Sequence, residues 1–255
     1  MPKESLIPPV ELIVANNVGV HDKENILKEY TRVGKYISTV LKNRANLKPS
    51  DSVLDMGCGS GRVAMHLTEY LEGGTYYGVD IVKSSINWCG DAYKEFPNFH
   101  FIHADLYSKF YNPDGRFNSE NYRFPFDDGT LDVIWSSSLF THMLIAGVDN
   151  YLKEMARTLV PGGRIWNSYL LLDEISEPLV HGGPRKDGRR MEHKVDGGRI
   201  AYPDKPEWVV GLYKDRILEL HEKHGFEVVS VELTNWSGGR PEVPTGQDVI
   251  VAMKR

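Results

Sequence analysis

A glycine-rich run that follows a strand-like segment carries the strongest chemical signal in the sequence. Residues 53–62 read VLDMGCGSGR, and the residues of interest in it are Asp55, Gly57, Cys58, Gly59 and Gly61. Glycine is needed where the backbone takes a positive φ or where a ligand must touch the main chain. The N-terminus of a helix that follows such a turn presents unpaired N–H groups and a partial positive charge, which suit a carboxylate. We therefore expect a turn that holds a ligand; the alternative is a tight turn without one.

A second carboxylate strengthens this prediction. Asp80 ends the segment TYYGVD, the second expected strand. Ligands of open α/β sheets bind beyond the carboxyl ends of the strands, where a carboxylate can accept hydrogen bonds from both hydroxyls of a ribose. The alternative role for Asp80 is to cap the next helix. The spacing G-x-G-x-G differs from the G-x-G-x-x-G of dinucleotide sites, which disfavours that class.

A histidine after the fourth expected strand is the candidate general base. Residues 136–143 read SSSLFTHM, and His142 has an imidazole that titrates near neutral pH. It either removes a proton from a substrate hydroxyl or caps and packs the following helix. His103 lies in a strand pattern and is expected to be structural. Four further residues could reach the same site: Asp173, Glu174, His181 and His193. No histidine or carboxylate cluster has metal-ligand spacing, so no metal is expected.

Alternating strand and helix patterns must position these residues. The expected strands are Ser52–Met56, Thr75–Asp80, Phe99–Ala104, Leu131–Ser136, Arg164–Leu170, Phe226–Leu233 and Asp248–Met253. Helical spacing predicts helices from about Asp22, over 63–71, over 83–96, from Val148 to Leu159, and over 208–224. The pattern predicts a doubly wound α/β fold with a mostly parallel seven-stranded sheet. The connection between the last two strands is short and lacks a helix pattern, so the last strand should be antiparallel.

We expect one domain over residues 1–255, with an N-terminal helical segment at 1–46. Three long segments, 105–124, 171–207 and 234–247, each follow a strand on the carboxyl side of the sheet. Such segments either build the site or are tolerated surface insertions. The first is rich in aromatic residues, and the second contains the basic stretch 184–194, which is a mobile solvated loop, a lid or a substrate site.

Composition restricts the class of protein. The 255 residues carry a net charge of −5, which argues against a nucleic-acid partner. Two cysteines, Cys58 and Cys89, are expected to be free thiols in a reducing compartment. Neither a secretory signal nor a membrane-spanning apolar stretch is visible, so a cytoplasmic protein is expected.

Together these motifs resemble the class I S-adenosylmethionine-dependent methyltransferases, over about residues 47–170. Further matches are GVDI (78–81), HADL (103–106), FPFDDGTLDVIWSS (124–137) and LVPGGRIW (159–166). The resemblance implies that Asp55 and the turn from Gly57 to Gly61, with Cys58, hold the methionine end of S-adenosylmethionine. It implies that Asp80 binds the ribose and Ile81 packs on the adenine. It also implies that Asp105, with Leu106, contacts the adenine and that Ser136 lies beside the sulfonium.

The acceptor class is a separate expectation. The segments YNPDG (111–115), FTHM (140–143) and WSGGR with GQDVIVA (236–252) resemble bacterial methyltransferases of glycan or secondary-metabolite pathways. They imply O-methylation of a sugar or small-molecule hydroxyl. Two rival interpretations remain: a nicotinamide-dependent oxidoreductase on a related sheet, and a non-catalytic binding subunit that keeps the fold.

Overall fold

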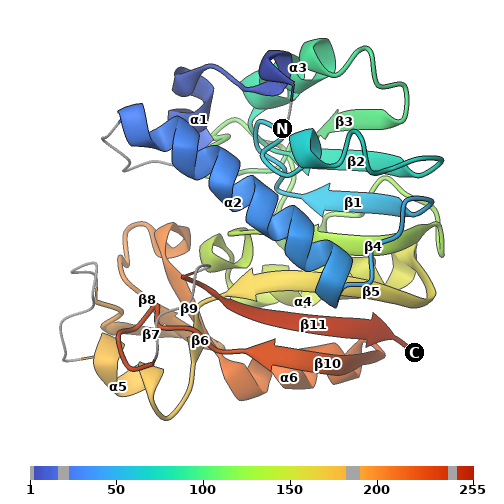
Figure 1. Cartoon of the computed structure of the whole chain (residues 1–255). Coiled ribbons are helices and arrows are strands. Elements are labelled where there is room, and N and C mark those ends of the chain that lie inside the picture. The colour runs from blue at the N-terminus through green and yellow to red at the C-terminus, as the bar shows by residue number, and fades with distance from the viewer. Residues whose placement is uncertain (1–2, 17–22, 182–189, 241–245) are drawn as a thin grey trace. The chain divides into compact units, whose positions relative to one another are not determined.

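The computed structural model of the chain describes residues 3–16, 23–181, 190–240 and 246–255. The chain forms two compact units (Figure 1). The first comprises Met1–Arg116 and Leu131–Trp135, and the second comprises Phe117–Thr130 and Ser136–Arg255. The expectation of a single domain over 1–255 stays a prediction.

The predicted seven-stranded sheet is confirmed. Its strand order is β10-β11-β5-β4-β1-β2-β3. The bounds are β1 (Ser52–Met56), β2 (Thr75–Asp80), β3 (Phe99–His103), β4 (Leu131–Ser136), β5 (Leu159–Tyr169), β10 (Phe226–Glu232) and β11 (Asp248–Lys254). β1 pairs in parallel with β2 and β4, and β2 pairs in parallel with β3. β11 is antiparallel to both β5 and β10, as the short last connection predicted.

The central strands β1 and β4 are buried on both faces, whereas β3 at the sheet edge is mostly partly exposed. In β1 every residue after Ser52 is buried, which is typical of a parallel strand covered on both sides. Tyr76 on β2 stacks on Phe99 with ring centroids 5.0 Å apart, and Tyr93 stacks on the same ring at 5.8 Å. These rings belong to an aromatic cluster whose strand residues, Tyr76 and Phe99, lie near the amino ends of β2 and β3.

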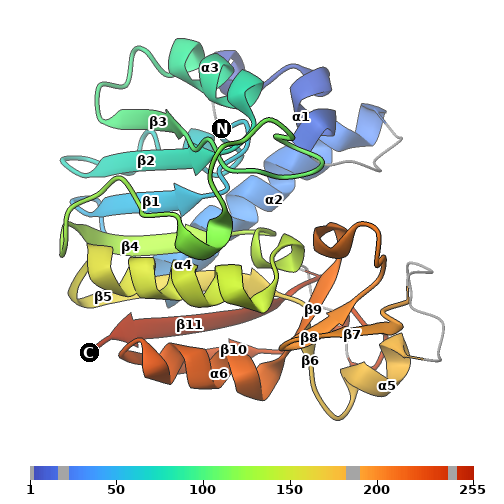
Figure 2. The ribbon, with the colours of Figure 1, turned by 180° about the vertical axis from the view of Figure 1, so that it is seen from behind.

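Helices follow the expected apolar periodicity in most places. α1 (Val10–Asn16), α2 (Lys23–Arg44) and α3 (Lys83–Ala92) belong to the first unit, and α4 (Ile145–Thr158) and α6 (Lys214–Lys223) belong to the second. α2 buries Ile26, Tyr30, Ile37 and Leu41, and Figure 1 shows it crossing the face of β1. In the second unit, α4 and α6 lie over β5, β11 and β10 (Figure 2).

The helix predicted over residues 63–71 is wrong. Only Ala64–His66 form a short 3-10 helix, η2, within a series of turns. Hydrogen bonds alternate between i→i+3, such as His66 N to Val63 O, and i→i+4, such as Met65 N to Gly61 O. α2 packs so closely here that a Cβ on Gly34 would lie 2.1 Å from the carbonyl oxygen of Arg62. This packing holds the segment in turns, so the glycine turn does not open a regular helix and gains less from a helix dipole.

The helix predicted over 208–224 is wrong in its first part. Residues 171–213 contain a second sheet of four strands in the order β6-β9-β8-β7. Its elements are β6 (Leu171–Leu172), α5 (Ser176–Val180), β7 (His193–Val195), β8 (Gly198–Ile200), η5 (Pro206–Trp208) and β9 (Val210–Tyr213). A Cβ on Gly198 would lie 2.1 Å from the Gly211 carbonyl oxygen, so glycines permit β8 and β9 to approach. The turn at Asp196-Gly197 is a hairpin signal that joins β7 to β8.

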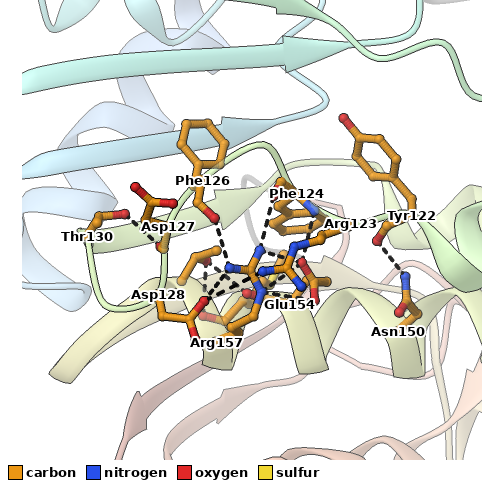
Figure 3. Close-up of polar contacts among 12 residues, drawn as sticks. Tyr122, Arg123, Phe124, Phe126, Asp127, Asp128, Thr130, Asn150, Glu154 and Arg157 are labelled. Atoms are coloured by element: carbon orange, nitrogen blue, oxygen red, sulfur yellow. Dashed lines mark hydrogen bonds and ion pairs between the residues drawn. The ribbon is translucent and has the colours of Figure 1, made fainter.

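An arginine on α4 fixes the segment that leads into β4 (Figure 3). The Arg157 guanidinium donates to the carbonyl oxygens of Phe124 and Phe126, at 3.0 and 2.8 Å. It also donates to Asp128 and Glu154, both at 2.7 Å, and Glu154 accepts the Phe124 N–H at 2.9 Å. Arg157 therefore bonds two backbone carbonyls and the Asp128 carboxylate of the FPFDDG motif, and this anchors the end of the 105–124 insertion to α4.

Candidate active site

Three glycines shape the turn after β1 in the first unit. Gly57, Gly59 and Gly61 have φ values of 83°, 54° and 80°, in the left-handed region that glycine adopts without a steric penalty. The N–H groups of Gly57 and Cys58 both donate to the Val79 carbonyl, at 2.8 and 3.1 Å, which ties the turn to the end of β2. A Cβ on Gly61 would meet the Tyr93 hydroxyl at 3.0 Å. The predicted turn is therefore present, and its glycines are required by its backbone.

Asp80 fastens this turn from the end of β2. Its two carboxylate oxygens accept the Gly59 N–H at 2.7 Å and the Val82 N–H at 2.8 Å. Burial raises the pKa of Asp80 against these stabilising N–H donors. An ionised carboxylate has about four lone-pair sites, so two bonds leave capacity for hydroxyl donors. Asp80 therefore both supports the turn and offers acceptors at its surface.

Asp55 lies beneath the turn, not on its surface. The side chain is buried and accepts a hydrogen bond from the Tyr76 hydroxyl at 2.8 Å. Burial raises the pKa of Asp55 to about 7. Cys58 and Cys89 are free and buried, and their thiols lie 3.6 and 3.9 Å from the Gly59 carbonyl oxygen. Burial raises the pKa of both thiols, so they act here as small apolar packing groups.

The residues expected around an adenine occupy the ends of β2 and β3. Ile81 is partly exposed, and its carbonyl accepts a hydrogen bond from His103 Nε2 at 3.1 Å, which gives His103 a structural contact. Leu106 is buried. The Asp105 carboxylate forms an ion pair with Arg116 at 2.5 Å, which holds the pKa of Asp105 below its ordinary value. The ion pair therefore joins the two ends of the 105–116 segment to each other.

Ser136 and His142 belong to the second unit. Ser136 is fully buried, and its hydroxyl donates to Asn167 Oδ1 on β5 at 2.9 Å. His142 lies in a short 3-10 helix, η4 (Phe140–His142), and is partly exposed. Its Nδ1 lies 3.2 Å from the backbone carbonyl oxygen of Glu207.

This contact selects a tautomer of His142. A carbonyl oxygen only accepts, so Nδ1 must carry the proton for the hydrogen bond to form. In the neutral ring the basic lone pair is then on Nε2. The arrangement is the one that a general base requires, since a backbone partner fixes both ring orientation and tautomer.

Three of the other titratable candidates pair with charged residues elsewhere in the second unit. Asp173 is buried in an ion pair with Arg240, and Glu174 lies 3.9 Å from Lys214. His181 is half-exposed and 3.0 Å from Glu192, and His193 lies on β7 with its side chain exposed. The basic stretch 184–194 falls largely outside the described residues, since 182–189 are not described.

The structure adds residues that sequence reasoning missed. Glu207 supplies the carbonyl that holds His142, and burial and the nearby Glu120 raise the pKa of its carboxyl group. Gln247 contacts the turn that follows β4. Glu207 lies outside the motifs, whereas Gln247 stands in the GQDVIVA match without an expected role, and both meet that segment only through folding. Within the described ranges, no group of three or more histidine, cysteine or carboxylate side chains could hold a metal ion. In the same part of the chain, no helix has the length and apolar character to cross a membrane.

Comparison with known sequences identifies a conserved domain type. Residues 54–167 match a family model described as a methyltransferase domain. The methyltransferase GfsG of Streptomyces halstedii is 26% identical over 165 residues, which cover 63% of this chain and 54% of the relative. The phthiotriol/phenolphthiotriol dimycocerosates methyltransferase of Mycobacterium tuberculosis is 30% identical over 114 residues, 44% of this chain and 34% of the relative. The chain thus spans about half or less of the length of these curated relatives.

Solved structures share the fold. The [4+2]-cyclase SpnF aligns with a TM-score of 0.59 and 16% identity, over 98% of this chain and 93% of its own. Magnesium protoporphyrin IX methyltransferase from Synechocystis, solved with bound S-adenosylmethionine, aligns with a TM-score of 0.56 and 12% identity, over 96% and 90%. Residues 54–167 thus match the methyltransferase-domain family, and the sheet order and glycine turn of the chain belong to a fold that these solved structures share.

Proposed function

We propose that this protein transfers a methyl group from S-adenosylmethionine to a hydroxyl oxygen of a sugar or other small molecule. The observation that carries the proposal is the turn after β1, in which three left-handed glycines are fastened by Asp80 at the end of β2. A carboxylate that is already bonded to the turn lies beside backbone that a ligand can approach closely. The methyltransferase-domain match over residues 54–167 and the solved structure with bound S-adenosylmethionine support that cofactor here.

The residues of the first unit fit the parts of that cofactor. The remaining lone pairs of Asp80 suit two ribose hydroxyls, and the partly exposed Ile81 suits one face of the adenine. Asp105 is the proposed acceptor for the adenine amino group, beside Leu106. The turn from Gly57 to Gly61 is the proposed seat of the methionine end, with Asp55 supporting it from below. When bound, the cofactor supplies a methyl group on a sulfonium that is already activated.

His142 is the proposed base. An alcohol is a poor nucleophile until its proton is removed, and the His142 tautomer places the accepting lone pair on Nε2. In this role Nε2 would take the proton of the acceptor oxygen as the methyl group passes from sulfur to that oxygen and S-adenosylhomocysteine leaves, while Nδ1–H stays bonded to the Glu207 carbonyl. The imidazolium that forms is stabilised by this carbonyl, and it returns its proton to solvent after product release. Ser136, being buried against Asn167, is proposed to shape the strand end and not to take part in proton transfer.

The relatives favour a small-molecule acceptor but include another class. Of the two bacterial relatives described above, the mycobacterial one is named for a small-molecule acceptor and GfsG is named for none. The eEF1A lysine and N-terminal methyltransferase homolog of Drosophila pseudoobscura pseudoobscura, 27% identical over 161 residues, is named for protein amino groups. A neutral imidazole base suits a hydroxyl acceptor, because an alcohol must lose its proton as it attacks. A lysine amine, by contrast, needs only to be uncharged before it attacks. This difference supports an oxygen acceptor.

Two measurements test the proposal in order. Isothermal titration with S-adenosylhomocysteine should show binding, and NAD should show none; the reverse result would support the oxidoreductase alternative. Labelled S-adenosylmethionine should then be incubated with a panel of methyl glycosides, hydroxylated macrolactones and lysine peptides. We expect label in the hydroxyl-bearing acceptors. Binding of the cofactor product without transfer to any panel member would favour a role without methyl transfer, such as a non-catalytic subunit or a protein like the cyclase SpnF.

The base assignment has its own test. His142→Gln keeps an amide that can donate to the Glu207 carbonyl but lacks a basic nitrogen. Turnover should fall about 10²- to 10⁴-fold, which is the usual contribution of a general base, with unchanged affinity for S-adenosylhomocysteine. Full turnover by this variant would discard His142 as the base and leave cofactor binding untouched.

A further inference from the structure

A strained backbone turn follows β4 in the second unit. Ser138 has a φ of 63°, and within the described residues only Asn46 shares the left-handed region among residues other than glycine. This region is unfavourable for a residue with a Cβ, and such residues persist where neighbouring contacts hold them. Ser138 lies two residues after the end of β4 and four residues before His142.

Gln247 and Ser168 hold this turn together. The Ser138 N–H donates to Ser168 Oγ at 2.8 Å, and Ser168 Oγ donates in turn to Gln247 Oε1, also at 2.8 Å. The Ser138 hydroxyl donates to the same Gln247 oxygen at 3.2 Å. Because the Ser168 hydroxyl donates its proton to Gln247, a lone pair of Ser168 Oγ is directed toward the Ser138 N–H. One carboxamide oxygen thus fixes both hydrogen bonds that keep Ser138 left-handed.

The turn leads directly to the histidine. The Ser138 carbonyl accepts the Thr141 hydroxyl at 3.1 Å, and the Leu139 carbonyl accepts the His142 N–H at 2.9 Å. The direction of η4 therefore depends on the conformation at Ser138. The His142 ring reaches the Glu207 carbonyl only if η4 keeps that direction.

We infer that Gln247 is a positioning residue for His142: it stabilises the left-handed Ser138 turn and so sets the tautomer and orientation of the imidazole. This inference rests on the proposed role of His142 as base. Gln247 lies just before β11, next to the far end of the 234–247 segment, so the C-terminal hairpin takes part in building the site.

The expected effect follows from two opposing preferences. A left-handed conformation disfavours a residue such as serine about tenfold relative to other conformations. Loss of two hydrogen bonds shifts a conformational equilibrium by about thirtyfold. Removing the Gln247 oxygen should therefore let other conformations of Ser138 dominate, with an about tenfold fall in turnover. Glycine at position 138 adopts the left-handed region readily, so it should make the turn independent of Gln247.

Three variants test this: Gln247→Met, Ser138→Gly, and the two combined. Asn98→Leu is the matched control, because Asn98 is also an amide with two hydrogen bonds, which it donates to the carbonyls of Leu71 and Gly74 in the first unit. The readouts are the His142 tautomer by ¹⁵N NMR, the affinity for S-adenosylhomocysteine, and kcat with the acceptor found in the panel. Gln247→Met should lose the Nδ1–H signal and about tenfold in kcat with unchanged affinity. The combined variant should recover both within about twofold, and Asn98→Leu should resemble the parent protein.

The other outcomes either overturn the inference or separate it from the proposed role of His142 as base. An unchanged tautomer in Gln247→Met, or a combined variant as impaired as the single one, would overturn it. A lost tautomer with unchanged kcat would uphold the positioning contact and reject His142 as the base, which separates the two proposals. If Gln247→Met does not fold, Gln247→Glu retains the accepting oxygen and should keep the tautomer; its loss there would overturn the inference.

Discussion

Replacing Asp80 by asparagine separates two roles that the structure joins in one carboxylate. Its two oxygens accept the Gly59 and Val82 N–H groups at 2.7 and 2.8 Å. Asparagine has the same shape but offers one acceptor oxygen and one NH₂ donor, so one of the two backbone N–H groups will face a donor. An unsatisfied buried N–H costs about 1–3 kcal/mol of unfolding free energy. For a chain of this size that corresponds to a fall in Tm of about 2–4 °C for each kcal/mol.

The same substitution should weaken nucleoside binding by a separate amount. Hydrogen bonds to a charged group contribute about 1.5–3 kcal/mol each, and ribose hydroxyls would lose the charged acceptor. We therefore expect the Kd for S-adenosylhomocysteine to rise about 10- to 100-fold. Loss of the Asp80 carboxylate should therefore lower stability as well as affinity, because the carboxylate also supports the glycine turn.

Titration calorimetry of Asp80→Asn, below its Tm, measures the binding effect, and thermal unfolding measures the structural one. Asp132→Asn is the matched control: Asp132 Oδ2 accepts the Ser52 N–H at 2.8 Å, at the amino end of β4. This control should lose a similar stability and keep its affinity. If Asp80→Asn binds S-adenosylhomocysteine as tightly as the parent while its Tm falls, Asp80 is only a structural cap and the ribose assignment is refuted.

Three further predictions concern the groups around this site. Burial raises the folded-state pKa of Asp55 from an ordinary 3.8 to about 7, so between about pH 4 and 7 the folded protein binds a proton that the unfolded chain does not. The stability that this proton contributes is lost as pH rises through 7. Tm measured from pH 5 to 8 should therefore fall less steeply in Asp55→Asn than in the parent, and equal slopes would contradict the raised pKa. Asp105→Ala should weaken nucleoside binding about tenfold, whereas replacing its exposed partner in Arg116→Gln should change the Kd less than about threefold; equal losses would mean that Asp105 acts by closing the insertion. Arg157→Met should lower the unfolding free energy, measured in urea, by about 3–5 kcal/mol, because Glu154 would be left buried without its cation. Combining Arg157→Met with Glu154→Gln should recover part of this loss. A loss below about 1 kcal/mol in the single variant would show that the network contributes little.

Much of the fold was predictable because its signals are local. β1, β2 and β4 occupy the residues that the sequence predicted, since short buried strands bounded by turns have a distinct pattern. The three glycines of the first turn have the positive φ that their spacing indicated. The antiparallel last strand followed from a connection too short for a helix.

The errors occurred where tertiary contacts override local preference. Residues 63–71 have helical spacing, yet close packing of α2 at Gly34 leaves only the 3-10 helix Ala64–His66. Residues 210–213 were assigned to a helix, yet they pair with β8 and β6 because neighbouring strands satisfy their backbone groups. A period of three or four residues in a short segment cannot reveal a strand partner that is distant in the chain.

The sequence by itself singled out the candidates for binding a nucleoside: a carboxylate near the end of one strand, three glycines after it, and Asp80 at the end of the next. Local backbone requirements impose that pattern, so it can be read without the fold. Only the tertiary structure decided how those groups are used. It placed Asp80 on the Gly59 N–H, buried Asp55 against Tyr76, and gave His142 its tautomer through a carbonyl 65 residues away in the chain. Hydrogen-bond partners and burial are properties of the packed chain, and no local pattern encodes them.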